Sequence, residues 1–344
     1  MIILSDLHLS KYIWPSRPAI YGDSYAPLRE LAASPPVNQN IVLAGDIFDT
    51  PTPDGDSLWE FHNFCSSMRK AGCKLYAVQG NHDRSTTPLF ASFGVERLTT
   101  APVTIDGLQV CGLDWMPTEK LHKALADVPK CDVLVMHSPF RHMLGFEGSW
   151  QLELQDIPEY VDIVIAGDVH QFNVTRTPTG KLFISPGATS PRSIAEIDST
   201  YGYIMLDGRK EVKRLLLKSR QFFTAQNDNE LKKYIEEAQQ LNALNPALPP
   251  VIFITSELAN IVPSEKNIIF SVRNQPKLPE KEFVVESLAG VGSCSLVDKL
   301  PAVVNKTEEP DVFNLLTTLL NTPIDNAQTI LNEWVEVNLK SSTR

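Results

Sequence analysis

The sequence predicts an α/β fold built around a buried, largely parallel β-sheet. Short apolar runs recur through the first two-thirds of the chain, each ends in polar residues, and a helical stretch separates two of them. Strands joined through a helix run parallel, and such strands are buried on both faces, so they read as nearly continuous apolar runs. Because 344 residues exceed what one compact core usually spans, we also expect a second domain or an appendage.

The elements follow one another in a regular order. Five apolar runs are the predicted strands of the sheet: 2–4, 41–44, 75–78, 133–136 and 163–166. A helix is predicted at 58–71, where apolar residues recur with a 3.6-residue period: Leu58, Phe61, Phe64, Cys65 and Met68. After Leu182 the alternation weakens into two predicted antiparallel strands, 201–206 and 212–217, which would complete a second sheet.

A domain boundary is predicted near 218–228. Beyond it, a helix at 230–241 and strands at 251–255 and 267–272 indicate a small α+β unit. From 310 onward two amphipathic stripes predict a helical hairpin, and Thr322-Pro323 with Asp325 fits an N-cap, a first-turn proline and an acidic third position. The predicted domains are therefore 1–220, 221–305 and 306–344.

Charge and cysteine usage limit the class of protein. The net charge is −10, from 41 acidic and 31 basic residues, whereas a duplex-binding protein is expected to show a basic face, so this balance taken alone argues against nucleic acid. Part of the acidic excess can instead be metal-binding carboxylates. Five scattered cysteines without a CxxC pair fit reduced thiols in the cytoplasm, and no apolar run is long enough to span a membrane.

Metal-ligand residue types follow directly after all five predicted strands of the parallel sheet. They are Asp6 and His8, then Asp46, then Asn81 and His82, then His137, and finally Asp168 and His170. Taken singly, each motif also fits a turn or a core histidine. Because the carboxyl ends of such strands share one edge of the sheet, the five segments are expected to converge there. Oxygen and imidazole ligands without thiolate suit manganese, iron, zinc or magnesium.

This ordered set resembles the calcineurin-like metallophosphoesterase superfamily, whose pattern is DxH, GD, GN(H), H and GxH. The resemblance implies a two-layer β-sandwich flanked by helices, and two divalent metal ions for phosphoester hydrolysis. It places one metal on Asp6, His8, Asp46 and His170, and the other on Asp46, Asn81, His137 and Asp168. It makes His82 a catalytic acid or transition-state stabiliser, and gives Asp83 an orienting role.

One position departs from the superfamily pattern. Most members have histidine where this chain has Asp168. An aspartate still ligates a hard divalent ion and adds a negative charge, which favours Mn2+ or Mg2+ over softer ions.

A longer stretch, 45–83, resembles the SbcD type of DNA nuclease, and 185–190 does so to a lesser degree. This implies an exonuclease, with possible endonuclease activity, that acts at DNA ends in repair and recombination. It also implies a homodimer and a partner, the SbcC-type SMC-like ATPase. Asp49 is then either an acid beside the active site or a turn residue.

The same resemblance makes 221–305 a capping domain that positions DNA. The C-terminal hairpin either grips the ATPase or folds back on the chain. A basic cluster at the junction either contacts DNA phosphates or is an ordinary solvated face, and consists of Arg209, Lys210, Lys213, Arg214, Lys218 and Arg220.

Two other functions stay open at this point. The metal motifs also fit a stand-alone phosphodiesterase or phosphatase, although such an enzyme has no use for residues 220–344. A non-catalytic scaffold is the third possibility, and only Asp168 keeps it open, since His82 and ligand-capable residues occupy every other motif position.

Overall fold

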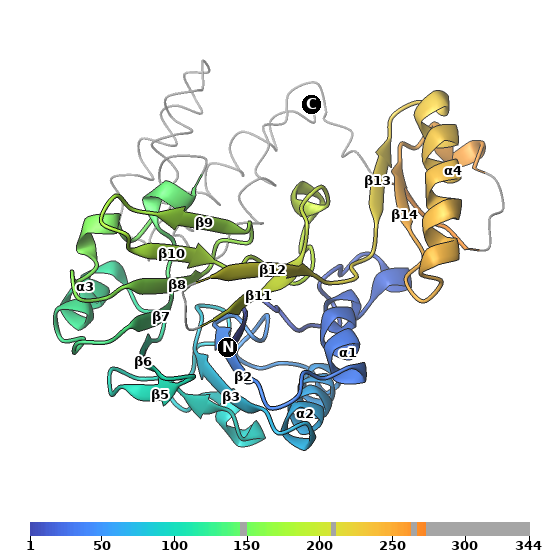
Figure 1. Cartoon of the computed structure of the whole chain (residues 1–344). Coiled ribbons are helices and arrows are strands. Elements are labelled where there is room, and N and C mark those ends of the chain that lie inside the picture. Colours follow the sequence, from blue (N-terminus) through green and yellow to red (C-terminus); the bar gives the residue numbers. More distant parts are fainter. Residues whose placement is uncertain (145–149, 208–210, 263–266, 273–344) are drawn as a thin grey trace, which may run out of the picture. The chain divides into compact units, whose positions relative to one another are not determined.

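Two mixed sheets of six strands each stack face to face (Figure 1). The computed structural model describes residues 1–144, 150–207, 211–262 and 267–272, which all belong to one unit. The first sheet has the strand order β12 (Val212–Leu216), β11 (Gly202–Leu206), β1 (Ile2–Leu4), β2 (Asn40–Ala44), β3 (Lys74–Val78) and β4 (Glu96–Arg97). The second has the order β5 (Val103–Ile105), β6 (Leu108–Leu113), β7 (Val133–His137), β8 (Ile163–Gly167), β10 (Leu182–Ser185) and β9 (Asn173–Arg176).

The alternation of side chains along each strand divides the core into layers. In β1, Ile3 joins the apolar cluster between the two sheets, whereas Ile2 and Leu4 belong to the cluster under α1 (Ala26–Ala33) and α2 (Gly55–Lys70). The outer face of the second sheet packs on α3 (Thr118–Ala126), and Figure 1 shows α3 beside β7 and β8. The predicted pair of sheets flanked by helices is confirmed.

The predicted helix at 58–71 is α2, and its stripe of Phe61, Phe64, Cys65 and Met68 is buried against the first sheet. It begins three residues earlier than predicted because Asp54 caps it: the Asp54 carboxylate accepts a hydrogen bond from the Ser57 N–H at 2.9 Å.

The placement of the late antiparallel strands was wrong. We expected 201–206 and 212–217 to complete a second sheet, but β11 pairs antiparallel with β1 and β12 pairs with β11, so both extend the first sheet. The apolar pattern identifies these strands but carries no information on the edge to which they pair, because that edge is set by contacts distant in the sequence.

A third sheet lies beyond the predicted boundary. Its three parallel strands are β13 (Phe222–Ala225), β14 (Val251–Ile254) and β15 (Ile269–Val272), and α4 (Asp228–Leu244) connects the first two. The helix and strands predicted in this region are therefore present. One face of the third sheet packs on α4. The other face packs against Trp14, whose ring centroid is 5.3 Å from that of Phe222. The predicted helical hairpin at 306–344 lies outside the described residues.

Short 3-10 helices occupy several connections, at Pro18–Ile20, Asp23–Tyr25, Leu89–Phe93, Arg141–Met143, Leu154–Asp156, Ile194–Glu196 and Leu258–Asn260. Within the described ranges, no helix combines the length and apolar character that crossing a membrane would require.

Candidate metal centre

The five strand-end motifs meet at one edge of the sandwich, although they come from two sheets. Strands β1, β2 and β3 of the first sheet carry the motifs at Asp6, Asp46 and Asn81. Strands β7 and β8 of the second sheet carry those at His137 and Asp168. The sheets stack with the carboxyl ends of these parallel strands together, so residues up to about 160 positions apart come into contact.

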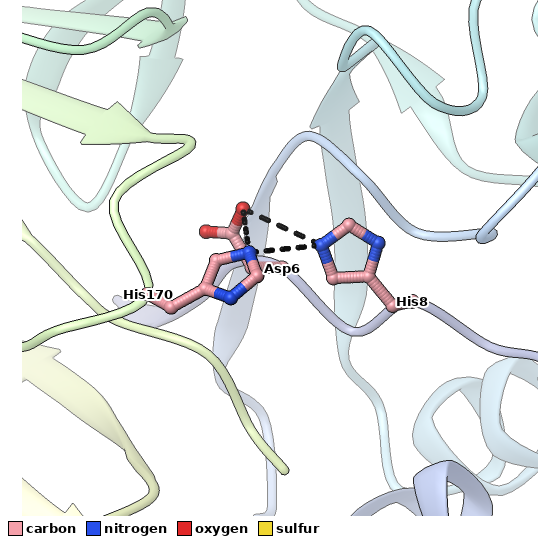
Figure 2. A group of neighbouring side chains, drawn as sticks. All are labelled: Asp6, His8 and His170. Carbon is pink, nitrogen blue, oxygen red and sulfur yellow. Dashed lines mark hydrogen bonds and ion pairs between the residues drawn. The ribbon is translucent and has the colours of Figure 1, made fainter. Parts of the chain in front are cut away.

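One group of potential metal ligands consists of Asp6, His8 and His170 (Figure 2). The two imidazole Nε2 atoms are 3.1 Å apart, and the Asp6 Oδ1 atom lies 4.0 Å from that of His8 and 3.8 Å from that of His170. Figure 2 shows the three side chains directed toward a common point. This arrangement offers one oxygen and two nitrogen atoms to a single cation.

A second group forms around His137. The His137 Nε2 atom lies 3.4 Å from Asp46 Oδ2, 3.6 Å from Asp168 Oδ1 and 3.1 Å from the side-chain amide of Asn81. The same Asp46 Oδ2 atom lies 3.5 Å from His8 Nε2 in the first group. Asp46 therefore stands between the two groups, in contact with a histidine of each.

The backbone at these residues is strained. Asp6, His8, Asp46 and Asp168 have positive φ angles of 51°, 43°, 49° and 81°. Non-glycine residues adopt this region uncommonly, and the strain persists only where the surrounding structure imposes it. Four of the six such residues in the described part of the chain are candidate ligands, so the fold holds these side chains in an unfavourable conformation that directs them inward.

Three glycines let the motifs approach one another. A Cβ atom on Gly80 would meet the carboxylate of Asp46, and a Cβ on Gly45 or Gly167 would meet the imidazole ring of His137. The glycines in the GD, GN and GD motifs are therefore required by close packing around the site. Any larger residue there would displace a candidate ligand.

Burial shifts the proton affinities of the candidate ligands in opposite directions. Burial lowers the pKa of His8 to about 4, and it raises the pKa of Asp168 to about 6, with some help from the nearby carboxylates of Asp6 and Asp46. Burial alone would lower the pKa of His137, but the Asp46, Asp6 and Asp168 carboxylates outweigh it and raise that pKa. In the metal-free protein, a proton on His137 therefore partly neutralises the carboxylates.

The residues fit divalent cations. Asp6 and Asp46 are 1% and 2% exposed, and burying charges of like sign is costly unless a positive charge compensates them. Oxygen and imidazole donors of this kind suit hard or borderline ions. The donor atoms of Asp6, His8 and His170 lie within 4.8 Å of one another, and so do those of Asp6, Asp46 and His137, so each set has the size of a metal site.

Asp83 is buried beside the candidate ligands, but its carboxylate binds main-chain N–H groups. Its carboxylate accepts hydrogen bonds from the N–H groups of Ile47 and Gly80, both at 2.7 Å. Burial and the nearby Asp46 charge raise the pKa of Asp83 to about 7. Asp83 therefore links the loops after β2 and β3, which carry Asp46 and Asn81.

His82 and Asp49 lie at the open side of the site. The His82 Nδ1 atom is 2.9 Å from the main-chain oxygen of Asp49, and each side chain is 21% exposed. The Asp49 carboxylate is 3.4 Å from His8 Nδ1, so Asp49, which lies in a bend of the chain, is in contact with a candidate ligand.

Two further residues at the site were not predicted from the sequence. Glu196 Oε1 lies 3.2 Å from His170 Nδ1, and the Arg192 guanidinium donates to Asp49 Oδ1 at 2.7 Å. Both residues follow an ordinary loop after β10, and neither belongs to a strand-end motif. Only the folded structure brings Glu196 and Arg192 into contact with the site.

The basic cluster is divided among different environments. Arg220 is buried, and its guanidinium pairs with Asp23 at 2.6 Å and also donates to the Pro249 carbonyl oxygen. Arg214 lies over the Phe172 ring at 4.3 Å. The remaining described members, Lys213 and Lys218, are exposed, whereas Arg209 and Lys210 lie outside the described residues.

The chain is similar to known phosphoesterases and repair nucleases. The family model described as the calcineurin-like phosphoesterase superfamily domain matches residues 1–210. The DNA double-strand break repair protein Mre11 of Methanosarcina acetivorans is 27% identical over 235 residues, which cover 62% of this chain and 38% of that protein. The Mre11 protein of Sulfurisphaera tokodaii is 21% identical over 292 residues, 77% of this chain and 74% of its own.

Similarity to the SbcD component of the Escherichia coli (strain K12) nuclease SbcCD is local. It amounts to 33% identity over 84 residues, 24% of this chain and 21% of that protein. The matches to the Methanosarcina proteins span 38% of the length of those relatives. A solved structure of a cold-active protein-tyrosine phosphatase from Shewanella aligns over 63% of this chain and 80% of its own, with a TM-score of 0.32 and 14% identity.

Proposed function

The chain belongs to the calcineurin-like phosphoesterase superfamily, and on this premise we propose that it is a metal-dependent nuclease that hydrolyses phosphodiester bonds at DNA ends. One observation carries the proposal: Asp46 Oδ2 lies 3.5 Å from His8 Nε2 and 3.4 Å from His137 Nε2, between two groups of potential metal ligands, in a chain whose relatives include DNA double-strand break repair proteins and a component of a nuclease. Exonuclease activity is the primary expectation, and endonuclease activity is a possible addition.

The proposed ligands are those that the structure brings together. Asp6, His8, Asp46 and His170 would hold one divalent ion, and Asp46, Asn81, His137 and Asp168 the other. We expect Mn2+, with Mg2+ as the alternative, because three of these residues are carboxylates. Bound divalent cations supply charge neutralisation for the phosphodiester and a nucleophile at neutral pH.

His82 is the proposed acid. A carbonyl oxygen only accepts hydrogen bonds, so the contact with the Asp49 main-chain oxygen places a proton on His82 Nδ1. The Nε2 atom is then available for the substrate. When protonated, it can donate to the leaving oxygen or to the equatorial oxygens of the reacting phosphate. The His82 side chain is 21% exposed, so a substrate can reach it.

Surfaces outside the metal centre have proposed roles as well. The α/β unit of β13–β15 and α4 is the proposed capping domain, and the exposed Lys213 and Lys218 are the proposed phosphate contacts. We further propose that the protein acts as a homodimer, in the cytoplasm, with an SbcC-type ATPase whose coiled coil binds residues 306–344. Similarity to the SbcD component of the nuclease SbcCD supports the choice of this partner.

One experiment separates the candidate functions. The protein is incubated with Mn2+ and, in parallel, with linear duplex DNA, bis-p-nitrophenyl phosphate and a phosphopeptide, with His82→Ala as the control. We expect degradation from DNA ends that the control variant lacks. Turnover of only the small diester or the phosphopeptide would identify a stand-alone phosphodiesterase or phosphatase. A lack of turnover with every metal tested would identify a scaffold.

A further inference from the structure

We propose that Arg192 and Glu196, on the segment that enters the 3-10 helix Ile194–Glu196, are positioning residues for the metal centre. Neither residue belongs to a ligand motif. Together they orient His170 and His8 through the carboxylates of Glu196 and Asp49, and His82 through the main-chain oxygen of Asp49. This inference rests on the proposed metal centre, and it extends that centre to a segment distant from all five strand-end motifs.

Glu196 orients His170. Its Oε1 atom lies 3.2 Å from His170 Nδ1, and its Oε2 atom accepts the Arg192 main-chain N–H at 2.9 Å. A carboxylate accepts, so the proton of the neutral imidazole resides on Nδ1, and the lone pair of Nε2 points toward His8 and Asp6. Histidine ligands of metals generally donate their second ring N–H to such an acceptor, which sets the tautomer and the ring plane.

Arg192 orients Asp49, whose carboxylate lies beside His8 Nδ1 at an ion-pair distance. The guanidinium donates to Asp49 Oδ1 at 2.7 Å, and that oxygen is 3.4 Å from His8 Nδ1. The main-chain oxygen of Asp49 contacts His82 Nδ1 at 2.9 Å. Arg192 therefore acts on a candidate ligand and on the proposed acid through a single intermediate residue.

The two halves of this network are joined. His8 and His170 each have a carboxylate at Nδ1, and Arg192 contacts both carboxylates, Glu196 through its main-chain N–H and Asp49 through its guanidinium. In the tautomers with both Nδ1 atoms protonated, the two Nε2 lone pairs would face each other at 3.1 Å. Such a pair is repulsive unless a proton or a metal ion lies between the two nitrogen atoms, so the segment Arg192–Glu196 prepares the two rings to share a cation.

The test measures Mn2+ binding as well as turnover. Titration calorimetry on the full chain should find that Glu196→Gln weakens one of the two Mn2+ equivalents by about 10- to 100-fold, the usual effect of losing such a partner. Arg192→Ala should weaken the same equivalent and lower kcat, because Asp49 loses its anchor. The KM for linear DNA should stay unchanged in both variants, since neither side chain is proposed to touch substrate. Arg192→Lys should recover part of the loss, because lysine keeps the charge opposite Asp49.

Two exposed positions provide matched controls. Glu119→Gln on α3 and Arg176→Ala on β9 make the same changes of charge away from the site, and both should bind Mn2+ as the unchanged chain does. Thermal unfolding of each variant checks folding, and Glu196→Gln and Arg192→Lys keep a side chain of similar shape or charge at each position.

The outcomes distinguish this inference from the proposed function. Unchanged Mn2+ affinity in Glu196→Gln and Arg192→Ala, with DNA cleavage intact in the parent chain, would overturn the positioning role alone. A parent chain that binds two Mn2+ equivalents but leaves DNA intact, with one equivalent weakened in the variants, would overturn the nuclease proposal and support the positioning role. A parent chain that binds no divalent ion would overturn both.

Discussion

His137 and Ala44 join the two sheets at the candidate metal centre. The His137 Nδ1 atom, at the end of β7, lies 2.8 Å from the main-chain oxygen of Ala44, at the end of β2 in the other sheet. Since the carbonyl can only accept, this contact protonates Nδ1 and leaves Nε2 facing Asp46. The alignment of the two sheet edges and the orientation of a candidate ligand thus depend on the same hydrogen bond.

Substitution of Gly45, the residue after Ala44, tests this contact. Gly45 has a φ of 90°, and a Cβ atom there would overlap the His137 ring. Gly45→Ala should therefore lower the free energy of unfolding by more than the roughly 1–2 kcal/mol expected for the backbone strain of a left-handed alanine. It should also weaken Mn2+ binding. Thermal unfolding and calorimetric titration measure the two effects.

Gly180→Ala is the matched control, because its φ is 85° and no atom lies within 4 Å of the added Cβ. Gly180→Ala introduces the backbone strain without a steric overlap of the added Cβ atom. If the two variants lose equal stability and both keep full Mn2+ affinity, the contact at Gly45 has no role in ligand placement.

Removal of the central carboxylate should abolish activity without loss of the fold. Asp46 lies between His8 and His137, so Asp46→Ala removes an oxygen that both ligand groups use. We expect no detectable DNA cleavage, together with a far-UV circular dichroism spectrum and a cooperative thermal transition like those of the parent chain. The exposed Asp127→Ala should retain activity. DNA cleavage by Asp46→Ala at a rate near that of the parent would show that our ligand assignment is wrong.

Metal binding should strengthen as pH rises. The raised pKa of His137 means that this ring carries a second proton in the metal-free protein below that pKa, and a metal ion must displace it. Affinity should therefore fall with decreasing pH, by up to about tenfold per unit for each proton displaced. His8, with a pKa lowered to about 4, is already neutral above that pH and should release no proton.

Calorimetric titration of Mn2+ in two buffers of different ionisation enthalpy counts the protons released. We expect a net release below the raised pKa values of His137, His170 and Asp168 that declines as the pH passes them. A binding constant independent of pH, with no proton release, would contradict this assignment.

The buried ion pair between Arg220 and Asp23 should stabilise the junction with the third sheet. Burial raises the pKa of Asp23, and the Arg220 guanidinium at 2.6 Å offsets part of that rise. Arg220→Ala would leave this carboxylate buried without its partner, at a cost of about 3–5 kcal/mol. Chemical denaturation measures the loss.

The exposed pair Lys232 and Asp228 on α4 is the comparison. Lys232→Ala should cost about 0.5 kcal/mol or less, as exposed helical pairs do. The double variant Arg220→Ala with Asp23→Ala should recover part of the loss. An Arg220→Ala effect as small as that of Lys232→Ala would mean that the buried pair does not stabilise the junction.

The sequence alone predicted much of the secondary structure and the superfamily. Apolar runs and a 3.6-residue stripe are local signals, so the strands that became β1, β2, β3, β7 and β8 and the helix α2 could be predicted. The match of residues 1–210 to the calcineurin-like phosphoesterase model confirms the resemblance inferred from the strand-end motifs. The same motifs supplied every candidate ligand that the structure brings together.

Only the tertiary structure decided how these pieces combine. The motifs converge across two stacked sheets instead of along one, β11 and β12 extend the first sheet, and Arg220 turns inward to Asp23. Glu196 and Arg192 reach the candidate ligands from a loop that carries no motif. Each of these features depends on contacts between residues distant in the chain, and such contacts leave no periodic or local pattern in the sequence from which they could be predicted.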